Sequence, residues 1–122
     1  LQAALWREAF HLVGTGAATV ADIDAAIVRG PGLRWALMGL CLLILLSFGA
    51  GGLAHTLDHL GPLMEAMWAD LGDPRLTPAL KATLVQGLER ALEGRDRDAM
   101  VAERDRLLVD LVRQKRAAPN LP

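Results

Sequence analysis

The stretch EAFHLVGTGAATVADID, residues 8–24, indicates the end of one helix, a glycine turn and the start of another helix. Apolar side chains recur at helical spacing up to Val13, on one broad face. The two glycines of the turn favour a helix end, because glycine accepts the left-handed backbone conformation that commonly closes a helix. Thr19 and Asp22 then form a capping-box pattern, in which each side chain satisfies a backbone N–H at the start of the next helix.

Helical patterns separated by Gly and Pro continue to the end of the chain, and no alternating strand pattern interrupts them. The sequence therefore predicts an all-α fold, a multi-helix domain. We expect an apolar set in the last helix to face inward: Met100, Leu107, Leu108, Leu111 and Val112. The helices expected after the glycine turn cover residues 19–29, 33–47, 51–60, 62–71, 77–93 and 96–116.

The composition suits one domain and gives no sign of a nucleic-acid partner. The chain has 122 residues and a net charge of −1, whereas nucleic-acid binding usually requires a basic face. Residues 1–62 hold three basic and four acidic side chains, and residues 63–122 hold ten of each. The first half is therefore apolar, and the second half predicts a solvated surface of mixed charge.

An apolar run from Trp35 to Ala54 carries no charge and is long enough to suggest a membrane span. Four glycines fall inside it, and the cluster at 48–52 favours a bend between two helices. The other interpretation is a buried helix or subunit interface of a soluble domain. Cys41, the lone cysteine, lies in this run, and we expect it to be a buried small hydrophobe rather than a reactive thiol.

Few residues form a pattern that could carry chemistry. His55 and His59 share a helix face, but a metal site needs a third ligand, which this pattern lacks. The glycines at 49–52 have neither the spacing nor the preceding strand of a phosphate cradle. Arg34 and Trp35 follow a Gly-Pro-Gly turn at a helix start, where an arginine could clamp a carboxylate or phosphate. The alternative for this pair is an arginine that merely flanks an apolar helix.

Three segments together resemble the C-terminal domain of NAD-dependent L-3-hydroxyacyl-CoA dehydrogenases. The first is the stretch 8–24, with its Glu-Ala pair, its glycine, its Ala-Thr and its Asp-Ile-Asp triplet. The second is GPGLRWALMG at 30–39, and the third is GAGGLAH at 49–55, followed by a Gly-Pro pair. The Gly-Leu-Arg-Trp motif and ERDRLL at 103–108 look closest to the branch that contains L-carnitine dehydrogenase and lambda-crystallin.

The resemblance implies a two-part enzyme, with an N-terminal Rossmann domain that binds NAD and is absent from this chain. Residues 1–116 would be the helical domain, which in the family forms a homodimer and closes one side of the substrate cleft, and residues 117–122 would be a frayed tail. The full-length enzyme would be a cytoplasmic oxidoreductase of fatty acid metabolism or a related route. It would oxidise a 3-hydroxy group by hydride transfer to NAD.

For the site, the resemblance implies that Arg34 and Trp35 line or buttress the substrate cleft. We expect no catalytic, cofactor-binding or metal-binding residue in this chain, which alone would be inactive. Neither nucleic acid nor a membrane is an expected partner.

The chain departs from the family pattern inside the apolar run. The family commonly has Gly-Pro where Gly39-Leu40 stands, an aromatic-His pair near Ile44-Leu45 and an acid near Ala50. All these positions are apolar here, so few polar groups are left for a substrate. Two alternatives remain open, a membrane-anchored helical protein with a span near 35–54 and a stand-alone helical interaction module.

Overall fold

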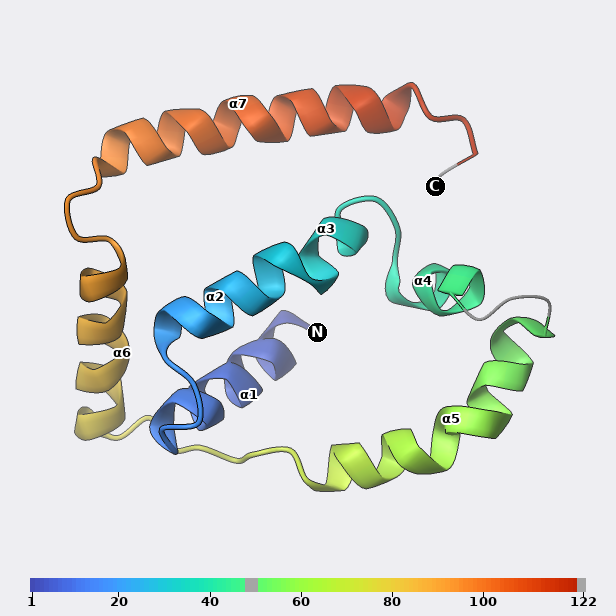
Figure 1. The fold of residues 1–122 in the computed structure, drawn as a ribbon, viewed down its shortest axis with the longest axis horizontal. Coiled ribbons are helices and arrows are strands. Elements are labelled where there is room, and N and C mark those ends of the chain that lie inside the picture. The colour runs from blue at the N-terminus through green and yellow to red at the C-terminus, as the bar shows by residue number, and fades with distance from the viewer. Residues whose placement is uncertain (48–50, 121–122) are drawn as a thin grey trace.

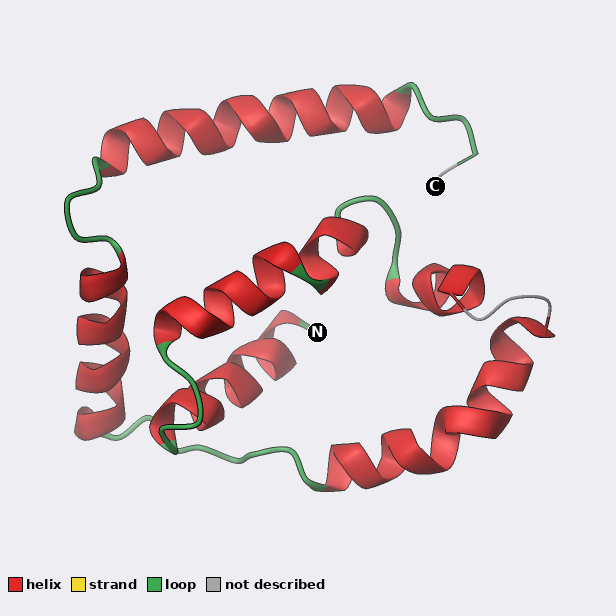
Figure 2. Cartoon of the chain, viewed as in Figure 1, coloured by secondary structure: helices red, strands yellow, loops and turns green. Residues whose placement is uncertain are grey.

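The structure, a computed structural model, describes residues 1–47 and 51–120 (Figure 1). Over these residues the chain forms helices joined by loops and contains no strand, which confirms the all-α prediction (Figure 2). The bend and phosphate cradle considered at 48–52 fall mainly on 48–50, which lie outside the described residues. The helices are α1 (Gln2–Gly14), α2 (Val20–Arg29), α3 (Pro31–Trp35), α4 (Leu40–Ser47), α5 (Gly52–Ala69), α6 (Pro78–Ala91) and α7 (Arg97–Arg116).

The turn between α1 and α2 has the predicted construction. Helix α1 ends at Gly14, and Gly16 adopts a left-handed φ of 76°. The Asp22 backbone N–H donates to Thr19 Oγ1 at 3.1 Å, and the Thr19 backbone N–H donates to Asp22 Oδ2 at 3.0 Å. The capping box is therefore complete. Hydrogen bonds from the Thr19 hydroxyl and then from the Thr19 backbone lower the pKa of the Asp22 carboxyl below its ordinary value of 3.8.

This lowered pKa predicts an acid-sensitive helix start. A carboxyl whose pKa falls on folding stabilises the protein above its unfolded pKa, and that contribution is lost as the pH falls through the folded pKa. We therefore expect the stability advantage of the wild type over Asp22→Asn to shrink as the pH falls below 3.8. Urea unfolding of both proteins across this range measures it, and a constant difference would contradict the prediction.

Helix α6 packs against both α1 and α2, and the most buried apolar side chains of the described residues lie in this group of helices. Val13 of α1 and Leu80 of α6 are its most buried apolar side chains, with 8% and 9% of their surface exposed. Two glycines allow the approach. A Cβ at Gly87 would lie 2.6 Å from Val20 Cγ2, and one at Gly14 would lie 3.2 Å from Leu80 Cδ1.

A loop from 71 to 77 returns the chain from α5 to this group of helices. The buried Gly72 donates its backbone N–H to Glu8 Oε2 of α1 at 2.8 Å. A Cβ on Gly72 would overlap the His11 side chain, one turn further along α1. Glu8 and His11 thus both contact the loop from one face of α1, and this close fit requires glycine at position 72.

Replacement of Gly72 by alanine should destabilise the protein by about 1–3 kcal/mol, the usual cost of forcing extra atoms into a packed site. Gly39→Ala is the matched control, because a Cβ there meets nothing within 4 Å. We expect the control to change the unfolding free energy by no more than about 0.5 kcal/mol. Urea unfolding compares the two variants, and equal effects would refute the close fit of Gly72 against α1.

Two predicted helix boundaries are wrong. The helix expected over 33–47 is divided into α3 and α4. Helix α3 ends because the backbone N–H groups of Leu37 and Met38 both donate to the Arg34 carbonyl. Conversely, the helices expected over 51–60 and 62–71 form one helix, α5, with Pro62 inside it. Figure 1 shows α5 changing direction about half-way along, as an internal proline typically causes.

Two burial predictions are also wrong, and for the same reason. Cys41 of α4 is exposed, and most of the apolar set of α7 is exposed rather than turned into a core. Helix α4 is almost entirely apolar, and within the described residues its main packing partners are α3 and α5. Much of its remaining surface is exposed among the described residues, so apolar sequence there does not produce burial.

Candidate substrate-side site

The Gly-Pro-Gly turn positions Arg34 and Trp35 in the last turn of α3. Gly30 ends α2 and begins α3, with φ −104° and ψ −114°. Pro31 occupies the first turn of α3, where the missing N–H costs nothing. A Cβ on Gly32 would lie 2.7 Å from the Ile27 carbonyl oxygen, so the backbones of α2 and α3 approach each other closely.

The two candidate residues have different surroundings, although they are neighbours on α3. Arg34 is exposed, and within the described residues no acid forms an ion pair with it. Trp35 is half-buried, and its indole Nε1 is enclosed without a hydrogen-bond partner among the described residues. The guanidinium is thus available to a ligand, whereas the indole is partly covered.

Arg34 carries the charge of this segment of the chain. It is the only charged side chain from residue 30 to residue 57, counting histidine as neutral. Helix α4, which packs against α3, has no charged residue at all. A single guanidinium beside an apolar surface can bind and orient a carboxylate or phosphate. It supplies no nucleophile and no general base, so this arrangement can position a substrate but cannot by itself transform one.

Two hollows lie elsewhere among the described residues, and neither includes Arg34 or Trp35. The larger, about 620 Å³, runs between the α1–α2 turn and α6, where Thr83 and Arg90 face it. The smaller, about 330 Å³, includes His11 and Arg75. Sequence patterns did not single out these residues, because α6 and the loop at 71–77 reach the α1–α2 turn only in the folded chain.

The histidine pair forms no metal centre within the described residues. The rings of His55 and His59 stack, with centroids 6.1 Å apart, and both side chains are exposed on α5. No group of three His, Cys, Asp or Glu side chains in the described part of the chain is placed to hold a metal ion. The pair thus forms part of the polar surface of α5.

The apolar run can be compared directly with the helices that form from it. Among the described helices, none is by itself both long and apolar enough to cross a membrane. Helices α4 and α5 meet the length and composition criteria only when taken together, as a bent pair.

Trp35 offers a test of what surrounds α3. A buried donor without a partner is unfavourable, so its removal offsets part of the packing lost when the ring becomes smaller. Trp35→Phe should therefore cost no more than about 1 kcal/mol of unfolding free energy, whereas Trp35→Ala should cost about 3 kcal/mol. Chemical denaturation measures both. A large loss for Trp35→Phe would contradict an indole N–H without a partner.

Comparison with known proteins agrees with this helical architecture. Residues 1–95 match the family described as 3-hydroxyacyl-CoA dehydrogenase, C-terminal domain. The chain belongs to this family. The match includes α1 to α6, and thus both Arg34 and Trp35. Helix α7 lies beyond the residues that define the family domain.

Curated relatives extend the likeness into α7. The chain is 53% identical over 113 residues to the L-carnitine dehydrogenase of Streptomyces griseus subsp. griseus, a match that covers 93% of this chain and 34% of that protein. For the L-carnitine dehydrogenases of Streptomyces coelicolor and Bacillus cereus the identities are 50% and 41%, over 93% and 92% of this chain and 36% and 34% of those proteins. The chain thus spans about a third of the length of these relatives, and most of α7 falls within the matched region.

Proposed function

We propose that this family domain forms the substrate side and the dimer interface of an NAD-dependent dehydrogenase that oxidises L-carnitine or a related 3-hydroxy acid. The observation that carries the proposal is the 53% identity to an L-carnitine dehydrogenase over nearly the whole chain. The exposed guanidinium of Arg34 on an apolar surface supports it, because a 3-hydroxy acid carries a carboxylate that such a group binds well.

Arg34 and Trp35 would have complementary parts in binding. The Arg34 guanidinium would hold the substrate carboxylate and so orient the hydroxyl-bearing carbon toward the rest of the enzyme. Trp35, half-buried below it, would fix the position of α3 through ring packing. Their position at the end of a glycine-restricted turn supports these roles, because a rigid element positions a binding group better than a mobile one.

The redox chemistry would come from outside this domain. NAD is commonly held where a strand meets a glycine-rich turn and a helix, and the described residues contain no strand. The residues of this chain therefore do not fit the cofactor. The missing two-thirds of the relatives' length leaves room for an N-terminal Rossmann domain that binds NAD and supplies the catalytic groups. Residues 1–116 would then be the helical domain, and the domain alone would be inactive.

The dimer part of the proposal rests on α4. Its side chains are all uncharged, and Leu40, Leu45 and Leu46 expose 47%, 43% and 59% of their surface. Obligate subunit interfaces resemble a domain core divided in two, and this surface has that character. A homodimer through the apolar helices would cover it. We also propose a cytoplasmic location, where reducing conditions would keep the exposed Cys41 a free thiol.

Steady-state kinetics of the full protein that carries this chain test the enzyme part, with NADH formation from L-carnitine as the readout. Loss of a charge-assisted hydrogen bond costs about 1.5–3 kcal/mol, so Arg34→Ala should raise KM by roughly tenfold or more. Arg34→Lys should retain part of the binding, because it keeps the charge but not the forked geometry. Arg29→Ala, an exposed arginine at the end of α2, is the matched control and should leave KM unchanged.

Two results would overturn the proposal separately. Absence of NADH formation from L-carnitine and from other 3-hydroxy acids would refute the activity. A monomer by light scattering at micromolar concentration would refute the dimer.

A further inference from the structure

The smaller of the two hollows, about 330 Å³, lies between the end of α1, the loop at 71–77 and the start of α6. Its volume is within the range of sites that bind small molecules. No acidic side chain is among the described residues that line it. Its polar lining is made of cationic or hydroxyl-bearing side chains, namely His11, Arg75, Thr15, Thr77 and Thr83. This composition favours an anionic ligand over a cationic one.

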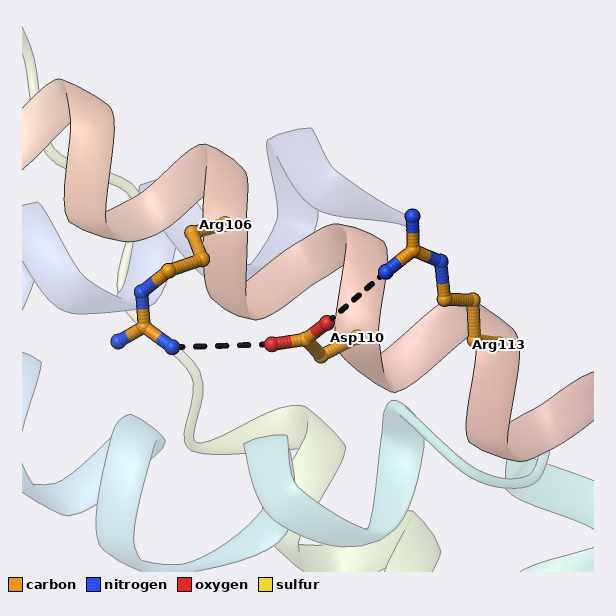
Figure 3. A network of polar contacts seen from close by, with 3 residues as sticks. All are labelled: Arg106, Asp110 and Arg113. Atoms are coloured by element: carbon orange, nitrogen blue, oxygen red, sulfur yellow. Dashed lines mark hydrogen bonds and ion pairs between the residues drawn. The ribbon is translucent and has the colours of Figure 1, made fainter.

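Arg75 differs from the arginines that pair with a carboxylate of their own helix. On α7, Arg106 and Arg113 lie 3.6 and 3.4 Å from the two carboxylate oxygens of Asp110 (Figure 3). Arg75 is exposed, and within the described part of the chain no acid forms an ion pair with it. Its neighbour Asp73 does not line the hollow. The guanidinium therefore has hydrogen-bond donors to offer a ligand.

The loop that carries Arg75 is held on both sides of this residue. Before it, the Gly72 backbone N–H donates to Glu8 Oε2 at 2.8 Å. After it, the Thr77 backbone N–H donates to the Arg75 carbonyl at 2.8 Å. Thr77 is in turn fixed to α6, because its Oγ1 accepts the Leu80 backbone N–H at 3.2 Å. The backbone at Arg75 is thus positioned without a ligand, which lowers the entropic cost of binding one.

His11 and Thr77 add hydrogen-bond donors from the two helices that border the hollow. The His11 side chain is half-buried on α1, and its ring makes no hydrogen bond to another described residue. The Thr77 hydroxyl accepts the Leu80 N–H, so its own proton remains available to a ligand. By contrast, the Thr15 and Thr83 hydroxyls donate to carbonyls of α1 and α6. One donor group therefore comes from each of α1, the loop and the start of α6.

Donors on three different elements suit a ligand with several acceptor oxygens. A phosphate monoester has three strong acceptor oxygens and a charge of about −1.5 to −2 at pH 7. A carboxylate has only two oxygens, and one guanidinium can bind both of them. We propose that this hollow binds a phosphate group, free or carried by a small metabolite, through Arg75 with His11 and Thr77 as further donors. The site does not include Arg34, and the inference is independent of the proposed activity.

Isothermal titration calorimetry with inorganic phosphate tests the site in the full protein that carries this chain. Saturating NAD is present throughout, so that a cofactor site elsewhere in that protein is already filled. Arg75→Ala should weaken phosphate binding by roughly tenfold or more, because it removes a charge-assisted hydrogen bond. Arg75→Lys should lose less, because it keeps the charge without the forked geometry. Arg95→Ala removes an exposed arginine outside the hollow and, as the matched control, should leave the affinity unchanged.

His11→Phe tests the donor on α1. The substitution keeps a planar ring beside Gly72 but removes both ring nitrogens, so phosphate binding should weaken by roughly two- to tenfold. Circular dichroism checks that every variant keeps its helix content. If His11→Phe does not fold, the two Arg75 variants still decide the question, because Arg75 is exposed.

A second titration, with glycerol 3-phosphate, distinguishes the two sources of the phosphate group. If this ester competes with inorganic phosphate and binds at least as tightly, the ligand is a phosphorylated metabolite, whereas binding of inorganic phosphate alone indicates the free ion. The inference is overturned if inorganic phosphate does not bind, if Arg75→Ala binds it as the wild type does, or if Arg95→Ala loses as much affinity as Arg75→Ala.

Discussion

The close approach of α6 to α1 and α2 is the contact on which the described structure depends. Gly87 lets α6 come within reach of Val20, and Gly14 leaves room for the Leu80 side chain. A methyl group at Gly87 would force Val20 or the helices to shift, at a cost typical of overpacking. The capping box orients the start of α2, and the Glu8–Gly72 hydrogen bond holds the loop that precedes α6 against α1. Both features therefore support the same three-helix contact.

Beyond that contact, the described residues bury little apolar surface. Only Val13 and Leu80 among the described apolar side chains are buried, while α4 and α7 present large apolar side chains outward. Burial of apolar surface is the main favourable term in folding. A protein that leaves this much of it exposed gains stability when a partner covers it. The proposed homodimer would cover part of this exposed apolar surface.

The sequence predicted best those features that depend on a few neighbouring residues. The glycine-closed end of α1 and the Thr19–Asp22 capping box were predictable because each involves residues within four positions. The division near Leu37 and the continuity of α5 through Pro62 were not predictable. Both depend on which hydrogen bonds the backbone groups form once the helices are packed. The hydrogen bond from Gly72 to Glu8 joins residues 64 positions apart, and no sequence pattern predicts it.

The same difference between local and long-range contacts explains which features of the candidate site could be predicted. Arg34 and Trp35 follow a turn that sequence patterns identify, so their place at the end of α3 was predictable. The exposure of Cys41 and of the apolar side chains of α7 was not predictable, because hydrophobicity predicts that a side chain will be covered but not by what. The role proposed for Arg34 follows the same logic. A site formed between two domains takes groups from each of them, and a solitary arginine beside an uncharged helix would be one side of such a site.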